Sequence, residues 1–297
     1  MDQACEASVV VCTRNRRDLL EENAQSLLAQ RHPSFEIICV DDGSTDDTSQ
    51  LLGKLRGQHP GLIRVVRTEH KGPGPARNAG AAVARGKYLL FIDDDATAPP
   101  NWIADMLRLR KEHDCAVLCG GIQPYSIESP IERYLHYRMM TALGHKPREI
   151  KSAPTGNLLI ERSLFEAAGG FRDLVLPAAE DWDLSYRLRR QGARICYDPA
   201  AAVVHRYTPN PARADLAMRA TGAAGVYLAR LQGRSAAAYT IYALARFAAS
   251  PILVARRYPL DLYWLALRME WLFASSRARA YMRMLLGKPV FQAKNRD

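Results

Sequence analysis

Three consecutive carboxylates, Asp93, Asp94 and Asp95, directly follow an apolar segment at 87–92 that is predicted to be a buried strand. Like charges gathered at the end of such a strand repel one another and are costly to desolvate. A divalent cation removes this conflict, because Mg²⁺ binds one or two carboxylates together with substrate phosphates. The triplet therefore predicts a clamp for Mn²⁺ or Mg²⁺ and a diphosphate. The alternative is a solvated acidic turn before a helix that starts near Pro100.

The elements that must position these carboxylates alternate along the chain. Short apolar runs typical of buried strands lie at 8–13, 35–40, 62–66 and 87–92, and helical patterns separate them. Strands that alternate with helices predict an α/β fold with a mostly parallel sheet flanked by helices. Open sheets of this kind bind ligands beyond the carboxyl ends of their strands. The three carboxylates lie at such an end.

The pattern changes near residue 210, where strands stop and Ala-, Leu- and Arg-rich helical runs begin. We expect two domains, an α/β domain over 1–210 and a basic α-helical appendage over 211–297. The charge supports this division, since 206–297 holds 15 Lys and Arg against 4 Asp and Glu, whereas 1–205 holds 26 against 27. A basic surplus indicates an acidic binding surface, such as membrane lipid or nucleic acid.

Four motifs, together with a Gly-Pro-Ala-Arg-Asn segment at 74–78, occur in an order that strongly resembles the family 2 glycosyltransferases of GT-A fold. The four are VCTRNR at 11–16, VDDGSTD at 40–46, FIDDD at 91–95 and EDWDLSYR at 180–187. The resemblance covers about residues 8–207. It implies a Rossmann-like GT-A domain, with the helical appendage lying outside it. It also implies an inverting, metal-dependent transfer of a sugar from a nucleoside-diphosphate donor, most often UDP-linked, to an acceptor hydroxyl.

The resemblance assigns nucleotide-sugar contacts to residues near strand ends. Asp41 reads the nucleoside, while Thr13 and Asn15 belong to the motif that lines the same pocket. Arg77 faces the diphosphate, for which a guanidinium offers a fork of donors. The simpler interpretations are helix capping for Asp41, a buried strand threonine for Thr13 and a surface arginine for Arg77.

For the metal, the resemblance implies that Asp95 binds the cation directly and that Asp93 faces the cation, its bound water or the ribose. Asp94 is the middle position of the motif and is assigned to the nucleotide-sugar site. His205 follows an apolar strand-like run and corresponds to a further metal ligand in many relatives. A purely structural histidine is the alternative.

The acidic motif at 180–183 is assigned to catalysis. A sugar hydroxyl must lose its proton as it attacks, so a carboxylate within hydrogen-bond reach is needed as general base. We expect Asp181 in this role with Glu180 beside it, unless the cluster merely complements a helix dipole. Asn157 is assigned to the loop that faces the sugar, and Trp182 could stack on a sugar ring or belong to the core.

Other classes of protein fit less well. A dinucleotide-binding enzyme needs GxGxxG directly after the first strand, and neither this motif nor GxxxxGK[ST] is found. A non-catalytic carbohydrate- or nucleic-acid-binding protein would not need Asp41, Asp93, Asp95 and Asp181 together. We therefore expect an enzyme that does not bind nucleic acid, with a glycan, a lipid-linked saccharide or a natural product as acceptor.

The sequence shows no signal peptide, no apolar run of about 20 residues and six scattered cysteines, which favours a reducing, cytoplasmic location. Segment 256–283 combines Tyr263, Trp264 and Trp271 with flanking arginines, a composition suited to a membrane interface. We expect a peripheral protein at the inner face of the membrane. The alternative is that this segment packs on the core or forms a homodimer.

Overall fold

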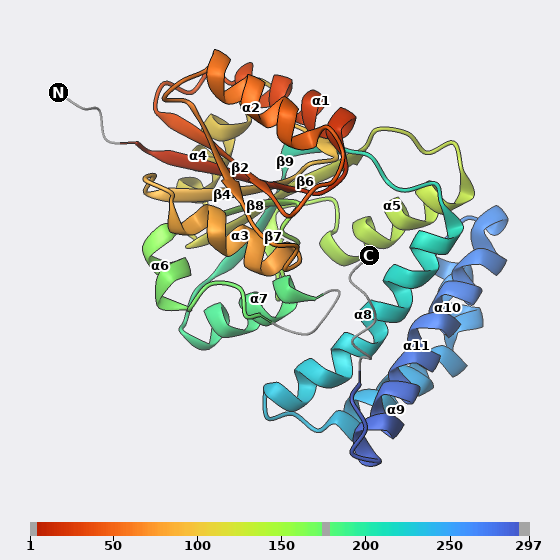
Figure 1. Ribbon diagram of the computed structural model, residues 1–297. Helices are drawn as coiled ribbons and strands as arrows, with labels where there is room; N and C mark the ends of the chain where they lie inside the picture. Colours follow the sequence, from red (N-terminus) through yellow and green to blue (C-terminus); the bar gives the residue numbers. More distant parts are fainter. Residues whose placement is uncertain (1–4, 174–178, 291–297) are drawn as a thin grey trace. The chain divides into compact units, whose positions relative to one another are not determined.

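The computed structural model describes residues 5–173 and 179–290, which form two compact units (Figure 1). The α/β unit comprises 5–125, 145–173 and 180–206, and the helical unit comprises 126–144, Ala179 and 207–290. The division thus falls near the boundary expected at residue 210. The helix at 130–143, which the sequence placed in the first domain, groups with the C-terminal helices instead.

The α/β unit is built on a nine-stranded sheet with the order β3-β2-β1-β4-β8-β6-β9-β5, and β7 pairs with β9. The strands are β1 Ala7–Thr13, β2 Phe35–Asp41, β3 Ile63–Arg67, β4 Tyr88–Asp93, β5 Ala96–Thr97, β6 Val117–Pro124, β7 Arg148–Glu149, β8 Asn157–Glu161 and β9 Ile195–His205. The first four are parallel and β6 is parallel to β9, whereas β8 runs antiparallel between β4 and β6.

Helices connect these strands: α1 Arg17–Leu28, α2 Thr48–Gln58, α3 Pro73–Ala82, α4 Trp102–Glu112, α6 Arg162–Ala167 and α7 Glu180–Arg190. Figure 1 shows α1 and α2 on one side of the sheet and α3 on the other. Pro73 lies in the first turn of α3. A proline is tolerated there because the first N–H groups of a helix have no intrahelical partner.

The strand order reverses next to β1, since β2 and β3 extend the sheet on one side and β4 on the other. Crossover connections on opposite faces leave a crevice at the carboxyl ends of β1 and β4. The motifs that follow these strands must therefore meet at one edge. The predicted α/β class is confirmed, but the sheet is mixed and not mostly parallel, since four of its strand pairs are parallel and four are antiparallel.

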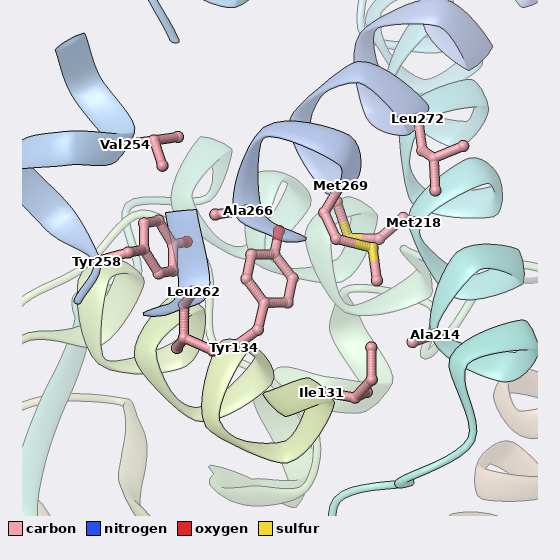
Figure 2. Close-up of a cluster of buried hydrophobic side chains, with 10 residues drawn as sticks. All are labelled: Ile131, Tyr134, Ala214, Met218, Val254, Tyr258, Leu262, Ala266, Met269 and Leu272. Carbon is pink, nitrogen blue, oxygen red and sulfur yellow. The ribbon is translucent and has the colours of Figure 1, made fainter. Parts of the chain in front are cut away.

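The helical unit contains α5 Pro130–Leu143, α8 Pro211–Leu231, α9 Ala236–Ala248, α10 Ser250–Arg257, the short 3₁₀ helix η1 Leu260–Leu262 and α11 Tyr263–Leu285. Figure 2 shows the cluster of buried side chains that joins α5, α8, α10, η1 and α11. Tyr134 of α5 stacks on Tyr258 with ring centroids 5.4 Å apart. Burial of these apolar and aromatic surfaces stabilises the unit.

Among the described residues, no single helix has the length and apolar composition needed to cross a membrane. The consecutive helices α9 and α10 reach the required hydropathy when taken together, but the axis bends by 68° between them. Pro251 stands in the first turn of α10, next to the bend.

Candidate functional site

The register of the central strands brings the predicted motifs to one edge of the sheet. Thr13, the last residue of β1, is paired with Asp41, the last residue of β2. On the other side of β1, Cys12 is paired with Asp93, the last residue of β4. Residues from three motifs that are up to 81 positions apart in sequence therefore lie next to one another.

The three carboxylates after β4 have different surroundings. The side chain of Asp94 is 6% exposed, that of Asp95 16% and that of Asp93 33%. Arg16 donates to Asp94 at 2.8 Å and to Asp95 at 2.9 Å. Burial raises the pKa of Asp94 to about 6 in spite of the nearby Arg16 guanidinium. The three carboxylates therefore carry more negative charge than Arg16 alone neutralises.

Strand β9 places His205 beside the three carboxylates, because His205 is its last residue and pairs with Ala96 of β5. His205 Nε2 lies 3.1 Å from an oxygen of Asp95 and 3.9 Å from an oxygen of Asp93. Burial acts to lower the pKa of His205, but the hydrogen bond and the charge of Asp95 outweigh it and raise that pKa. The pKa of Asp95 is lowered, because the contacts with His205 and Arg16 outweigh burial.

Asp93, Asp95 and His205 can together hold a metal ion, since one ligand atom from each lies within 4.8 Å of the others. Two carboxylates and one imidazole are a donor set that suits Mn²⁺, and also Mg²⁺ when oxygen ligands dominate. Gly156 leaves the space that Asp93 occupies, because a Cβ at this position would lie 2.7 Å from Asp93 Oδ2. The residues that the sequence predicted as metal ligands are thus brought together by the fold.

Arg77 connects this cluster to α7. Its guanidinium donates to Asp93 at 3.0 Å and to Glu180 at 2.7 Å, and it lies over the ring of Phe171. The two carboxylates raise the pKa of Arg77 although burial opposes them. The arginine predicted to face a diphosphate therefore also fixes the start of α7 beside the candidate metal ligands.

The three carboxylates at the start of α7 differ in their partners and in their burial. Asp183 is fully buried and paired with Arg187 at 2.8 Å and with Arg172 at 3.4 Å, and Glu180 is bound by Arg77. Asp181 accepts a hydrogen bond from the backbone N–H of Trp182. Burial and the charge of Glu180 raise the pKa of Asp181 to about 7. Asp181 is thus the carboxylate suited to exchange a proton near neutral pH.

The loops after β1 and β2 are joined by hydrogen bonds. The Asn15 side chain accepts from the Thr45 N–H at 2.8 Å, and the Asn15 N–H donates to Ser44 Oγ at 3.1 Å. Asp41 accepts from the Ser44 N–H, Ser49 and Arg67. Asp41 is therefore held in a fixed orientation at the edge of the sheet.

The structure does not direct every predicted residue to the site. Asn157 is fully buried, donates to the carbonyls of Gly121 and Ala201, and accepts from the indole of Trp102. Its amide thus joins β8 to β6 and β9, which corrects the assignment of Asn157 to the sugar-facing loop. Trp182 is half-buried on α7, and Thr13 is buried beside Asp94.

Two residues of the site were not identified from the sequence. Arg16 neutralises part of the acidic triplet. Asn23, on α1, donates to the carbonyl of Ala96 at 2.7 Å and to that of Asp93 at 3.2 Å, so it fixes the backbone on both sides of the triplet. The sequence contained one indication of the role of Asn23, because this polar residue lies on the same helical face as the apolar Leu20, Ala24 and Leu27.

The family model for glycosyl transferase family 2 matches residues 8–169, more than half of the chain. The protein belongs to this family, as the motifs predicted. Pre-mycofactocin glycosyltransferase of Mycobacterium tuberculosis is 28% identical over 211 residues, which are 67% of this chain and 42% of that protein. Poly(ribitol-phosphate) beta-glucosyltransferase of Bacillus spizizenii is 32% identical over 119 residues, or 39% and 19% of the two chains. The chain therefore spans less than half the length of these curated relatives.

Solved structures agree on the fold. The mannosyltransferase PcManGT of Pyrobaculum calidifontis, in complex with GDP-Man and Mn²⁺, superposes with a TM-score of 0.63 at 18% identity over 97% of this chain and 89% of that chain. Residues 1–349 of Staphylococcus aureus TarS, in complex with UDP-GlcNAc, give a TM-score of 0.56 at 18% identity over 95% and 92%. The predicted GT-A fold is confirmed.

If Asp93 is a metal ligand, the Gly156→Ala substitution will weaken metal binding. The added Cβ forces Asp93 Oδ2 to move, and a displaced ligand costs about tenfold or more in affinity. Titration of the protein with Mn²⁺, followed by the electron paramagnetic resonance signal of free Mn²⁺, measures this loss. Gly53→Ala on α2 is the matched control, because a Cβ there meets nothing within 4 Å. Equal affinities for the two variants would contradict the assignment.

Proposed function

We propose that the protein is an inverting glycosyltransferase that moves a sugar from a nucleoside-diphosphate sugar to an acceptor hydroxyl with the help of Mn²⁺ or Mg²⁺. The observation that carries the proposal is the convergence of Asp93, Asp95 and His205 at the carboxyl ends of the strands, with Arg77 joining them to α7. A nucleotide-binding sheet edge, a cation site and a candidate base thereby form one continuous site.

The donor is proposed to be UDP-linked, in keeping with the nucleoside role that the motif gives Asp41. Structural neighbours have been solved with UDP-GlcNAc and with GDP-Man, so a GDP-sugar is the first alternative. Asn15 and Thr13 border the same edge as Asp41. The divalent cation would be held by Asp93, Asp95 and His205, where it offsets the charge of the diphosphate leaving group.

Asp181 is proposed as the general base. Its raised pKa, about 7, leaves the carboxylate basic enough to accept a proton from a sugar hydroxyl at neutral pH. Glu180 is engaged in an ion pair with Arg77, and Asp183 is buried between two arginines. The role of Glu180 is to keep Arg77 and the start of α7 in position.

Inversion follows from a single displacement. The acceptor oxygen attacks the anomeric carbon, the bond to the diphosphate breaks, and Asp181 receives the hydroxyl proton. Arg77 contributes positive charge at the position where the diphosphate leaves. No covalent link between sugar and protein is needed in this scheme.

The acceptor is proposed to be a glycan, a lipid-linked saccharide or a hydroxylated natural product. A location at the cytoplasmic face of a membrane would suit the second of these. The alternative function, a non-catalytic carbohydrate- or nucleic-acid-binding protein, does not account for a carboxylate with a pKa near neutrality beside a metal-ligand cluster.

The first test is turnover with a panel of UDP- and GDP-sugars, selected by thermal shift. Hydrolysis or transfer is expected with Mn²⁺ or Mg²⁺, and excess EDTA should abolish it. Asp95→Ala should lose activity while its circular dichroism spectrum stays that of the wild type. Full turnover in EDTA would remove the metal from the mechanism. Donor binding without turnover under any condition would favour the non-catalytic alternative.

Asp181→Asn preserves the shape of the side chain but removes the proton acceptor, so kcat should fall by about two to four orders of magnitude. With saturating metal, kcat/KM of the wild type should rise with pH and level off above about pH 7, where Asp181 is ionised. The variant should lack this rise. Glu180→Gln is the comparison, because it retains Asp181 but removes the charge that helps to raise the pKa of Asp181, so the rise with pH should persist and begin at a lower pH. Turnover of Asp181→Asn within about threefold of wild type would place the base elsewhere.

The stereochemical outcome is a separate prediction. A product formed by single displacement carries the anomeric configuration opposite to that of the donor, which proton NMR of the first product resolves through the coupling constant of the anomeric proton. A product that retains the donor configuration would refute the displacement scheme while leaving the donor and metal assignments intact.

A further inference from the structure

The exposed side chains of α9 and α10 are apolar, except for Arg256 and Arg257 at the end of α10. Ile241, Tyr242 and Ile252 are 65%, 64% and 63% exposed. The positions at the same helical spacing are exposed as well, and all are alanines: Ala238, Ala245, Ala248 and Ala249. A helix face that meets water is normally polar. We call the side chains of these seven residues the α9–α10 stripe.

The opposite face of the two helices is already used. Ala236, Thr240 and Ala243 of α9 are buried, and α9 contacts α8 and α11. Val254 of α10 belongs to the buried cluster shown in Figure 2. The two helices are therefore fixed to the helical unit by one side, and the stripe is not needed for that packing.

The charged residues of the sequence segment that carries the stripe all have one sign. From Arg230 to Pro259 the sequence contains five arginines and no lysine, aspartate or glutamate. Arg230 and Arg234 are exposed before α9, and Arg256 and Arg257 are exposed at the end of α10. The fifth, Arg246, is paired with Glu270 at 3.0 Å. An apolar stripe thus lies between two pairs of exposed cations.

We infer that the α9–α10 stripe rests in the surface of an anionic membrane, with the arginine pairs on lipid headgroups. Apolar side chains enter the headgroup–acyl boundary while arginines meet anionic lipids. The helices lie in the interface and do not span the bilayer, because the axis bends by 68° and one side is packed against protein. A second copy of the chain fits less well, since a two-fold interface would bring the exposed arginines beside the stripe of one copy near those of the other.

This surface overlaps the segment 256–283 that the sequence indicated only at Arg256 and Arg257. Arg277 is 4% exposed, and its guanidinium lies between the rings of Tyr239 and Phe273 at 4.3 Å and 4.4 Å. It is therefore not available to headgroups, whereas Arg256 and Arg257 are. The inference does not depend on the proposed transferase activity, because lipid binding and sugar transfer are measured separately.

The test is co-sedimentation of the full chain with vesicles of phosphatidylcholine alone or mixed with phosphatidylglycerol. Binding is expected with the anionic vesicles and should weaken as salt rises. Ile241→Ser/Ile252→Ser should lower the partition coefficient about tenfold or more. Arg256→Gln/Arg257→Gln should lower it by about thirtyfold on anionic vesicles. Leu216→Ser, at a residue of α8 that is 68% exposed, is the matched control and should bind as the wild type does.

All variants carry changes at exposed positions, and thermal unfolding followed by circular dichroism verifies that they fold. Three outcomes would overturn the inference: no binding of the wild type to anionic vesicles at low salt, equal losses for the stripe and Leu216 variants, or a dimer in solution that Ile241→Ser/Ile252→Ser converts to a monomer. The last outcome would identify the stripe as a subunit interface. None of them bears on turnover of soluble donor and acceptor.

Discussion

The concentration of carboxylates at the carboxyl ends of the parallel strands β1, β2 and β4 is the constraint on which the α/β unit depends. The strand register places Asp41 and Asp93 at the same edge, and Asp94 and Asp95 follow within two residues. Like charges at this density are tolerated only where cations compensate them. The compensation comes from four separate segments of the chain, which supply Arg16, Arg67, Arg77 and His205. The loops and helices that carry these four residues are therefore held in place by their contacts with the carboxylates.

The cations do not compensate all of this negative charge, and the uncompensated charge lowers the stability of the folded protein. In the folded protein Asp94 and Asp181 have pKa values of about 6 and about 7, whereas an aspartate in an unfolded chain has a pKa of about 3.9. Between these values the folded state binds more protons than the unfolded state, so the contribution of both groups to stability falls as pH rises from about 4 to about 7. A bound cation would offset part of this loss at Asp94. The burial of Asp181 is consistent with a site arranged for proton transfer at the expense of stability.

The sequence predicted the parts of this site that depend on local pattern. Apolar runs located β1, β2 and β4. The polar residues after these strands could then be predicted to lie close together, because the carboxyl ends of parallel strands point in the same direction. Contacts between distant segments were less accessible. The run at 201–204 gave little sign that β9 extends from Ile195 through Pro199 to His205, and helical periodicity could not show that α5 packs with the C-terminal helices. Asn157 was misassigned because an amide looks the same in sequence whether it binds a ligand or, as here, two carbonyls of its own sheet and the indole of Trp102 on α4.

The acidic motif of α7 shows how helix geometry divides one cluster into several roles. Successive residues of a helix point about 100° apart, so Glu180, Asp181 and Asp183 face different neighbours. One direction meets Arg77, another meets Arg187, and Asp181 lies where burial and the charge of Glu180 raise its pKa. Because Arg77 binds both Glu180 and Asp93, the position of α7 is coupled to the proposed metal ligands. A cation that fixes Asp93 would therefore also fix the helix that carries Asp181, so that a donor complex and a correctly placed base would form together.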